Sequence, residues 1–166
     1  MKKTCFISIL LLCHLFVCTA QVKTTPTKRA ETSISNSKSD AKVALQFTNN
    51  YVAFCSSKQR IKVSQWVENN KLLTNHFKSA YIKLVNSALK SDPELGLDFD
   101  PILDAQDYPE KGFNIINYDS ATGYVTLNGK DWPAFVLVIR IVKQGNKWLV
   151  DGSGVINIPE EKRAKR

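Results

Sequence analysis

The hydrophobic positions in the first half of the chain recur at three- and four-residue steps. Val43, Phe47, Tyr51 and Phe54 have this spacing and follow Ser39-Asp40, a pair that can cap the start of a helix. Val63, Trp66 and Val67 fit a short second helix after a break near Ser56-Ser57. The strongest pattern predicts a long third helix that stops before Ser91-Asp92-Pro93, with one apolar face formed by Leu73, Phe77, Ala80, Tyr81, Leu84, Val85, Ala88 and Leu89.

The second half of the chain changes to β-branched and aromatic runs separated by turn residues. The turn signals are residues 119–123, Asn128-Gly129 and Gly145-Asn146, and the strands they predict cover residues 113–118, 124–127, 134–142 and 148–158. Helices followed by such a meander predict an α+β domain, in which the N-terminal helices pack on one face of a curved four-stranded antiparallel sheet.

The third predicted strand has apolar residues on both faces. Phe135, Leu137, Ile139 and Ile141 alternate with a second set that contains three valines and only one charged residue, Arg140. One face meets the helices, and the other needs a second cover. We therefore expect a homodimer through the outer face of the sheet.

The first twenty residues have the pattern of a secretory signal peptide. Lys2 and Lys3 precede an apolar stretch, residues 6–17, and a cleavage site is predicted after Ala20. The stretch is too short for a permanent membrane span, and Val17 before Cys18 disfavours lipid attachment at that cysteine. We expect an exported protein that is soluble in the periplasm or outside the cell.

The remaining chain divides into three parts by composition. Residues 21–40 are rich in Thr, Ser and Lys and predict a flexible polar linker, because such a segment buries too little apolar surface to offset its ordering entropy. Residues 41–159 form the single domain, and residues 160–166 form a charged, solvated C-terminal tail. After the leader only one of the four cysteines remains, Cys55, which excludes an internal disulfide and favours an inert thiol on a helix.

Most of the net positive charge of the chain lies outside residues 41–159. The formal charge is +8, and it falls to about +2 for residues 41–159 once the leader, the linker and the tail are set aside. A core this close to neutral gives no support to nucleic-acid binding. The charges are instead segregated: residues 41–90 carry eight bases and one acid, whereas residues 91–110 carry seven acids and no base.

This acidic stretch holds the most distinctive candidate residues. Asp98, Asp100, Asp104 and Asp107 offer oxygen atoms of the kind that calcium binds. An EF-hand loop counted from Asp98 fails, however, because Leu103 takes the place of the sixth-position glycine and Pro109 that of the final glutamate. We expect these carboxylates to bond nearby backbone amides and to pair with the basic helices instead, with no metal and no cofactor.

The same stretch carries a family resemblance. The segment Asp98-Phe-Asp-Pro-Ile-Leu-Asp-Ala-Gln-Asp-Tyr lies after the helical half and before a sheet that ends in Lys147-Trp-Leu-Val-Asp. In this it resembles an uncharacterised family of exported bacterial proteins in the nuclear-transport-factor-2-like superfamily, over about residues 41–158. The resemblance implies a cystatin-like α+β cone. It leaves function open, because the superfamily contains isomerases, dehydratases, transport adaptors and interaction modules.

The sequence contains few residues in a pattern typical of a catalytic acid or base, which favours a binding function over catalysis. His76 is the one histidine after the leader and lies off the apolar face of its helix, and neither Asp131 nor Asp151 has a histidine near it in sequence. We therefore predict a noncatalytic domain for a small ligand or a protein partner. Its candidate aromatics, beside the acidic loop, are Tyr51, Tyr108 and Trp132, with Trp66 as a further member. The alternatives are a cavity enzyme of the isomerase or dehydratase type, or an envelope immunity protein.

Overall fold

Three helices precede a four-stranded sheet, as the sequence predicts. The structure, a computed structural model, describes residues 28–57 and 61–165, with side chains from Asp40 onward. The helices are α1 (Lys28–Cys55), α2 (Val63–Asn69) and α3 (Asn75–Ser91). The strands are β1 (Phe113–Asp119), β2 (Tyr124–Gly129), β3 (Val136–Gln144) and β4 (Lys147–Ser153), and a short 3-10 helix, η1 (Glu160–Lys162), follows them.

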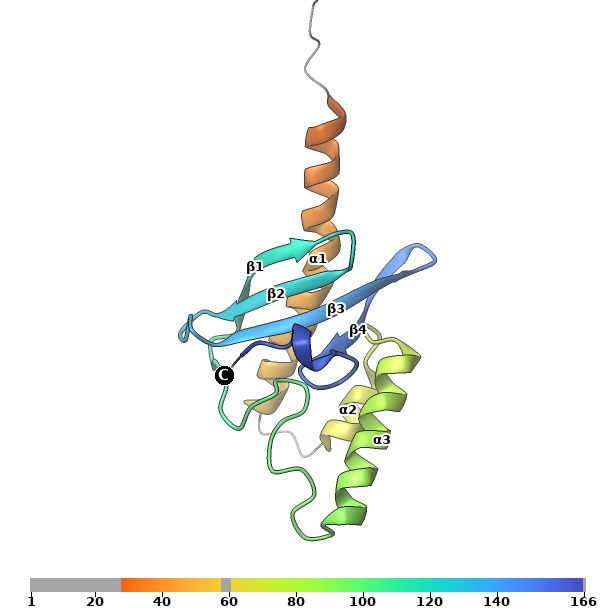
Figure 1. The fold of residues 1–166 in the computed structure, drawn as a ribbon, viewed down its shortest axis with the longest axis vertical. Helices are drawn as coiled ribbons and strands as arrows, with labels where there is room; N and C mark the ends of the chain where they lie inside the picture. The colour runs from red at the N-terminus through yellow and green to blue at the C-terminus, as the bar shows by residue number, and fades with distance from the viewer. Residues whose placement is uncertain (1–27, 58–60, 166) are drawn as a thin grey trace, which may run out of the picture.

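The sheet is an antiparallel meander in the order β1-β2-β3-β4. Helix α1 packs against one face and contacts all four strands, while α3 lies beside β4 (Figure 1). The segment before α3 joins the edge of β4, where the Thr74 N–H donates to the Val150 carbonyl at 3.0 Å. The predicted α+β class and the four antiparallel strands are thereby confirmed.

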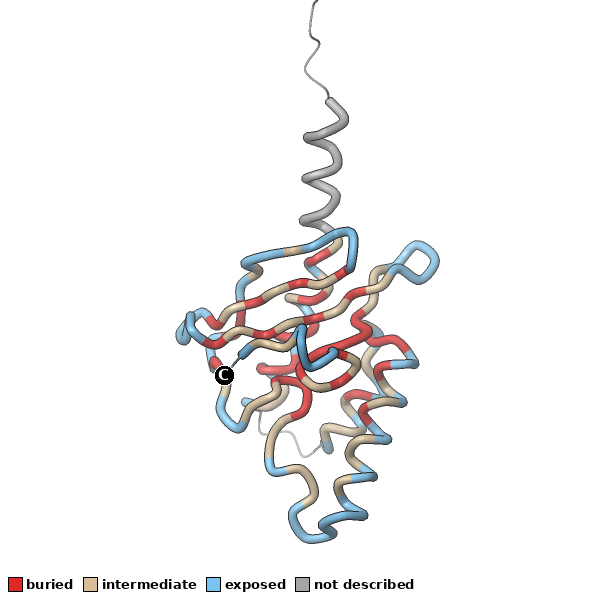
Figure 2. The backbone as a smooth tube through the Cα atoms, in the orientation of Figure 1, coloured by how far each residue is buried: buried red, intermediate tan, exposed pale blue. Residues whose placement is uncertain are grey.

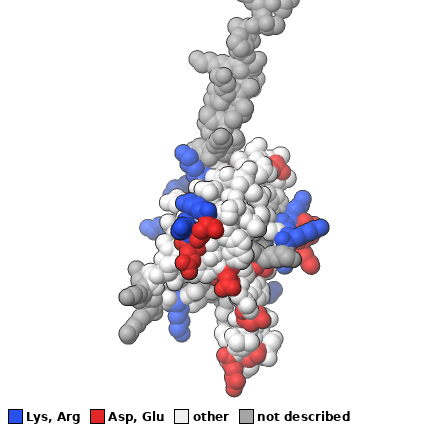
Figure 3. All heavy atoms as spheres, turned by 90° about the vertical axis from the view of Figure 1, so that its left-hand side faces the viewer, with Lys and Arg blue, Asp and Glu red and all other residues white. Residues whose placement is uncertain are grey.

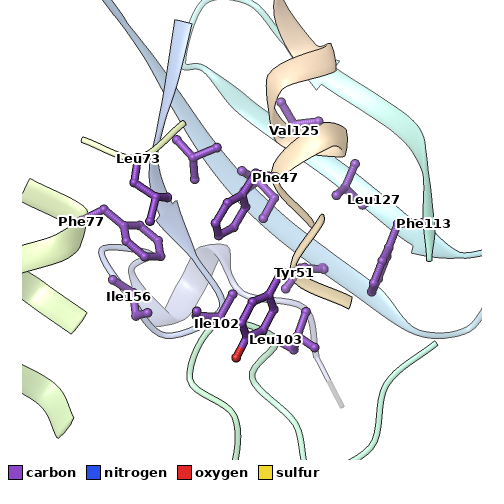
Figure 4. Packing of buried hydrophobic residues seen from close by; sticks show 14 of the residues in the cluster. Phe47, Tyr51, Leu73, Phe77, Ile102, Leu103, Phe113, Val125, Leu127 and Ile156 are labelled. Carbon is purple, nitrogen blue, oxygen red and sulfur yellow. The ribbon is translucent and has the colours of Figure 1, made fainter. Parts of the chain in front are cut away.

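The core lies between α1 and the sheet. The inward residues of β3, Leu137, Ile139 and Ile141, are buried, and along the strand they alternate with half-buried residues on the other face. Phe47 and Phe77 meet edge to face with ring centroids 5.8 Å apart (Figure 4). Buried positions follow the sheet and the helix behind it, whereas the far end of α3 is mostly exposed (Figure 2).

Helix α1 begins earlier than the sequence predicts. It starts at Lys28 rather than after Ser39-Asp40, so it includes residues 28–40, which the composition assigned to a flexible linker. Between Lys28 and Cys55 the chain has no glycine or proline. The buried residues Ala41 and Ala44 fix the first turns of the helix against the core. Extending an existing helix toward the N-terminus then costs little free energy, because the unfavourable nucleation step is already complete. Residues 21–27 and the predicted leader lie outside the described residues.

Strand β4 ends five residues before the predicted end at Ile158. The chain leaves the sheet because Gly154 and Asn157 both adopt left-handed backbone angles, with φ of 57° and 53°. The turn between them is closed by hydrogen bonds between the backbones of Ser153 and Ile156. The β-branched residues at 155 and 156 therefore form a turn that packs on the core rather than a continued strand.

The C-terminal tail is largely exposed at Glu160, Glu161, Lys162 and Lys165, and it also contacts the domain. The Lys162 ammonium lies 6.0 Å from the centre of the Tyr124 ring on the outer face of the sheet. The Arg163 Nε donates to the Ile158 carbonyl at 3.0 Å. Arg163 and Ala164 also border the outward residues Val136 and Val138 of β3. The chain thus covers part of its own outer face, and the homodimer stays a prediction.

Within residues 28–57 and 61–165, no helix has both the length and the apolar character that crossing a membrane requires. The predicted leader lies outside these ranges.

Candidate functional site

The acidic loop, residues 92–110, connects α3 to β1 and returns along the domain (Figure 1). On the face shown in Figure 3, carboxylates gather toward the lower end, where Figure 1 places the stretch after α3. Halfway along the loop, the backbones of Asp100 and Ala105 are joined by two hydrogen bonds of 2.8 and 3.3 Å. The turn they close inserts the buried side chains of Ile102 and Leu103 into the core beside Tyr51 (Figure 4).

Asp100 and Tyr51 form a polar pair at this turn, in which Tyr51 is buried and Asp100 is half-buried. The Tyr51 hydroxyl donates to Asp100 Oδ2 at 2.6 Å. Asp100 Oδ1 accepts from the backbone N–H groups of Ile102 at 2.8 Å and Leu103 at 3.0 Å. Burial raises the pKa of Asp100, although these three hydrogen bonds offset part of the rise. The pair ties the loop to α1, and the backbone bonds are the role that the sequence predicted for these aspartates.

Further titratable side chains surround the pair. Burial is the main cause that raises the pKa of the Cys55 thiol, and it also raises the pKa of Tyr108. Burial and then the charge of Asp100 raise the pKa of Tyr81 to about 12. The thiol therefore stays protonated at neutral pH and is a poor nucleophile, which agrees with an inert Cys55.

The pair of Tyr51 and Asp100 does not supply a free catalytic group. Both carboxylate oxygens of Asp100 already accept from protein donors, and Tyr51 is only 1% exposed. A general base must come within hydrogen-bonding distance of the proton that it removes. Tyr51 and Asp100 thus belong to the packed core, not to the mouth of a cavity as the sequence predicted for Tyr51.

The other acidic candidates lie apart from this pair. The backbone carbonyl of Asp98 accepts from the Gln106 side chain at 3.1 Å, and Asp104 adopts a left-handed φ of 55°. Asp107 is exposed. Across residues 28–57 and 61–165, no three His, Cys, Asp or Glu side chains come close enough together to hold a metal ion.

Asp107 and Trp132 come together in an open groove of about 460 Å³, which we name the Trp132 groove. Its other lining residues are Ala105, Gln106, Ala134, Phe135, Val136 and Lys165. Trp132 is 46% exposed, and its ring packs edge-on against Phe135, with ring centroids 5.2 Å apart. The groove therefore presents an aromatic face beside a carboxylate, and Tyr108 is the predicted aromatic that it does not include.

A second polar cluster was missed by the sequence reasoning. Asp151 is buried, and its Oδ1 accepts from the Thr74 hydroxyl at 2.7 Å and lies 3.1 Å from His76 Nδ1. The Asn157 amide nitrogen lies 3.1 Å from the same ring nitrogen, and Arg140 Nη1 lies 3.6 Å from Asp151 Oδ2. Because Thr74 also accepts from the Phe77 N–H at the start of α3, the cluster fixes that helix against β4.

His76 has the solvent exposure that the sequence predicted, with 66% of its side chain accessible, yet it has an aspartate partner. The partner is 75 residues away along the chain. A sequence signal existed only for Thr74, as a helix cap before an apolar face.

No protein-family model, no curated protein and no solved structure matches this chain. The resemblance to the nuclear-transport-factor-2-like superfamily therefore stays a prediction.

Proposed function

We propose that this chain is an exported, noncatalytic binding domain and that its ligand or protein partner occupies the Trp132 groove. A single observation carries the proposal: Trp132 is 46% exposed and lines the same open groove as Asp107. Aromatic side chains with an exposed face are typical of recognition surfaces, because they bury a large area on binding and lose little conformational entropy.

Three features of the structure support binding rather than catalysis. The half-buried carboxylate of Asp100 accepts from three protein donors, and that of Asp151 bonds Thr74 and thereby serves the start of α3. The Trp132 groove is open, so it does not exclude water from a reacting group. The cavity-enzyme alternative needs a free, desolvated acid or base, and neither aspartate supplies one.

We include in the same proposal that the fold is a cystatin-like cone and that the protein is exported. Helices on one face of an antiparallel meander agree with the cystatin-like cone that the resemblance implies. Export rests on the sequence of residues 1–20, with its basic start and short apolar stretch.

The groove can be tested with benzylammonium, which combines an aromatic ring with a cation. We expect it to shift the backbone amide resonances of residues 105–107 and 132–136 in a titration followed by NMR. Trp132→Ala should weaken its affinity at least about tenfold, the loss expected for a central aromatic contact. Ile116→Ala is the matched control, since Ile116 is 54% exposed on β1 but does not line the groove. Shifts centred on Tyr51 and Asp100 instead would contradict the proposal.

A further inference from the structure

The C-terminal tail, residues 160–165, lies along one side of the Trp132 groove. Five tail residues and Asp104 enclose one hollow, and Arg163 and Ala164 border the next hollow together with Val136 and Val138. Lys165 then lines the Trp132 groove itself. The hollows are adjacent because they share Asp104, Val136 and Lys165. The tail therefore passes between the acidic loop and β3 and ends at the groove.

Among the described residues, the side chains of Arg163 and Lys162 connect the tail to the domain. The Arg163 side chain donates to the backbone carbonyls of Ile158 at 3.0 Å and Val155 at 3.5 Å. Lys162 adds its approach to the Tyr124 ring. Neither of the ion pairs found among the described residues involves the tail. Glu160, Glu161, Lys162 and Lys165 are exposed, and an exposed segment at the surface can open locally without unfolding the domain.

The tail and the acidic loop, which face each other across the channel formed by these three hollows, carry charges of opposite sign. From residue 162 onward the tail reads Lys-Arg-Ala-Lys-Arg, whereas the acidic loop contributes Asp104 and Asp107. The floor is apolar, formed by Phe135 and Val136 at the groove. A segment with several basic side chains is therefore opposite in sign of charge to Asp104 and Asp107 on this surface.

We infer that the Trp132 groove binds an extended basic segment of a partner protein, and that the protein's own tail occupies part of the same surface and competes with it. The inference rests on the proposed function and adds the chemical class of the partner. The basic side chains of the partner lie along Asp104 and Asp107, and its end reaches Trp132. A tethered competitor is present at a local concentration of about millimolar, so the partner binds more tightly once the tail is released.

The test uses the full-length chain and a labelled synthetic peptide with the tail sequence Glu-Glu-Lys-Arg-Ala-Lys-Arg. Arg163→Ala removes the two hydrogen bonds that hold the tail, and it should increase the affinity for the peptide roughly tenfold over wild type. Adding Asp104→Asn and Asp107→Asn to this variant should reverse the gain, and the remaining binding should weaken with salt. Lys143→Ala is the control, because it removes an exposed positive charge outside the channel.

The outcomes separate the inference from the proposed function. Equal affinity of wild type and Arg163→Ala for the peptide would overturn competition by the tail. Binding that survives the two Asp→Asn changes would overturn the assignment of a basic partner to this surface. If benzylammonium binds at Trp132 but the peptide binds to neither chain, the groove is a binding site and the inference is wrong. Failure of both ligands removes the proposed function as well. Thermal melting of Arg163→Ala should match wild type, which excludes unfolding as the cause of any change.

Discussion

Replacing Gly154 with alanine is expected to destabilise the domain by about 3 kcal/mol or more, through two costs that add together. Gly154 has a left-handed φ of 57°, which a residue with a Cβ adopts only with strain. A Cβ at this position would also lie 2.5 Å from the Pro101 carbonyl oxygen and 2.7 Å from that of Ile102. Both obstacles are backbone atoms of the acidic loop, so the loop itself must move.

The expected loss of stability follows from the contacts that hold the acidic loop beside Gly154. The Val155 N–H donates to the Pro101 carbonyl at 3.0 Å, and the Ser153 hydroxyl donates to the Ile102 carbonyl at 2.7 Å. Moving the loop away from Gly154 lengthens both bonds and withdraws the fully buried Ile102 and Leu103 from the core. Hydrogen bonds and apolar burial are therefore lost together.

Gly145→Ala is the matched control for this prediction. Gly145 has nearly the same φ, 59°, but a Cβ there would find no atom within 4 Å. Its cost should be about 1 kcal/mol, from the backbone conformation alone. Urea unfolding of the two variants measures the difference, and equal losses would show that the close approach of the loop to Gly154 does not contribute to stability.

The parts of this fold that the sequence predicted are those with a local signal. The spacing of Phe77, Ala80, Tyr81 and Leu84 reflects one buried helix face, and Gly145-Asn146 marks the turn between β3 and β4. Such patterns arise from neighbours along the chain, and a single sequence contains them. The early end of β4 was missed because Val155 and Ile156 have strand-forming side chains, whereas the left-handed φ of Asn157 depends on its place in the fold.

The candidate site was predictable only in part, because its contacts join distant segments. Tyr51 and Asp100 are 49 residues apart, and Thr74 and Asp151 are 77 apart. The composition of the acidic loop indicated carboxylates that bond the backbone, which the structure shows for Asp100 among the four candidate aspartates. Neither ion pair among the described residues joins the loop to the basic helices, so that part of the prediction is not seen. The groove required Asp107 and Trp132 to meet, and their proximity follows from the way Ile102 and Leu103 draw the loop onto the core.

Replacing Asp100 with alanine is expected to cost about 3–5 kcal/mol, because it leaves several donors without an acceptor in the core. The Tyr51 hydroxyl loses its partner at 2.6 Å, and the N–H groups of Ile102 and Leu103 lose theirs. Asp100→Asn retains an oxygen for the two N–H groups and should cost less. Chemical unfolding measures both variants; a loss below about 1 kcal/mol for Asp100→Ala would contradict the role of the carboxylate in holding the loop.

The same carboxylate should also reverse the usual pH dependence of an aspartate. Burial raises the pKa of Asp100 in the folded state above its ordinary value of 3.8, so between these two values the folded chain binds the proton more strongly than the unfolded chain. The contribution of Asp100 to stability is therefore greatest below its unfolded pKa and is lost as pH rises through its folded pKa. The Asp100→Asn chain lacks this titration. The free energy of unfolding of wild type relative to Asp100→Asn should consequently fall from about pH 3 toward neutral pH. A difference that rises over that range would mean that the ionised form is the one that the fold stabilises.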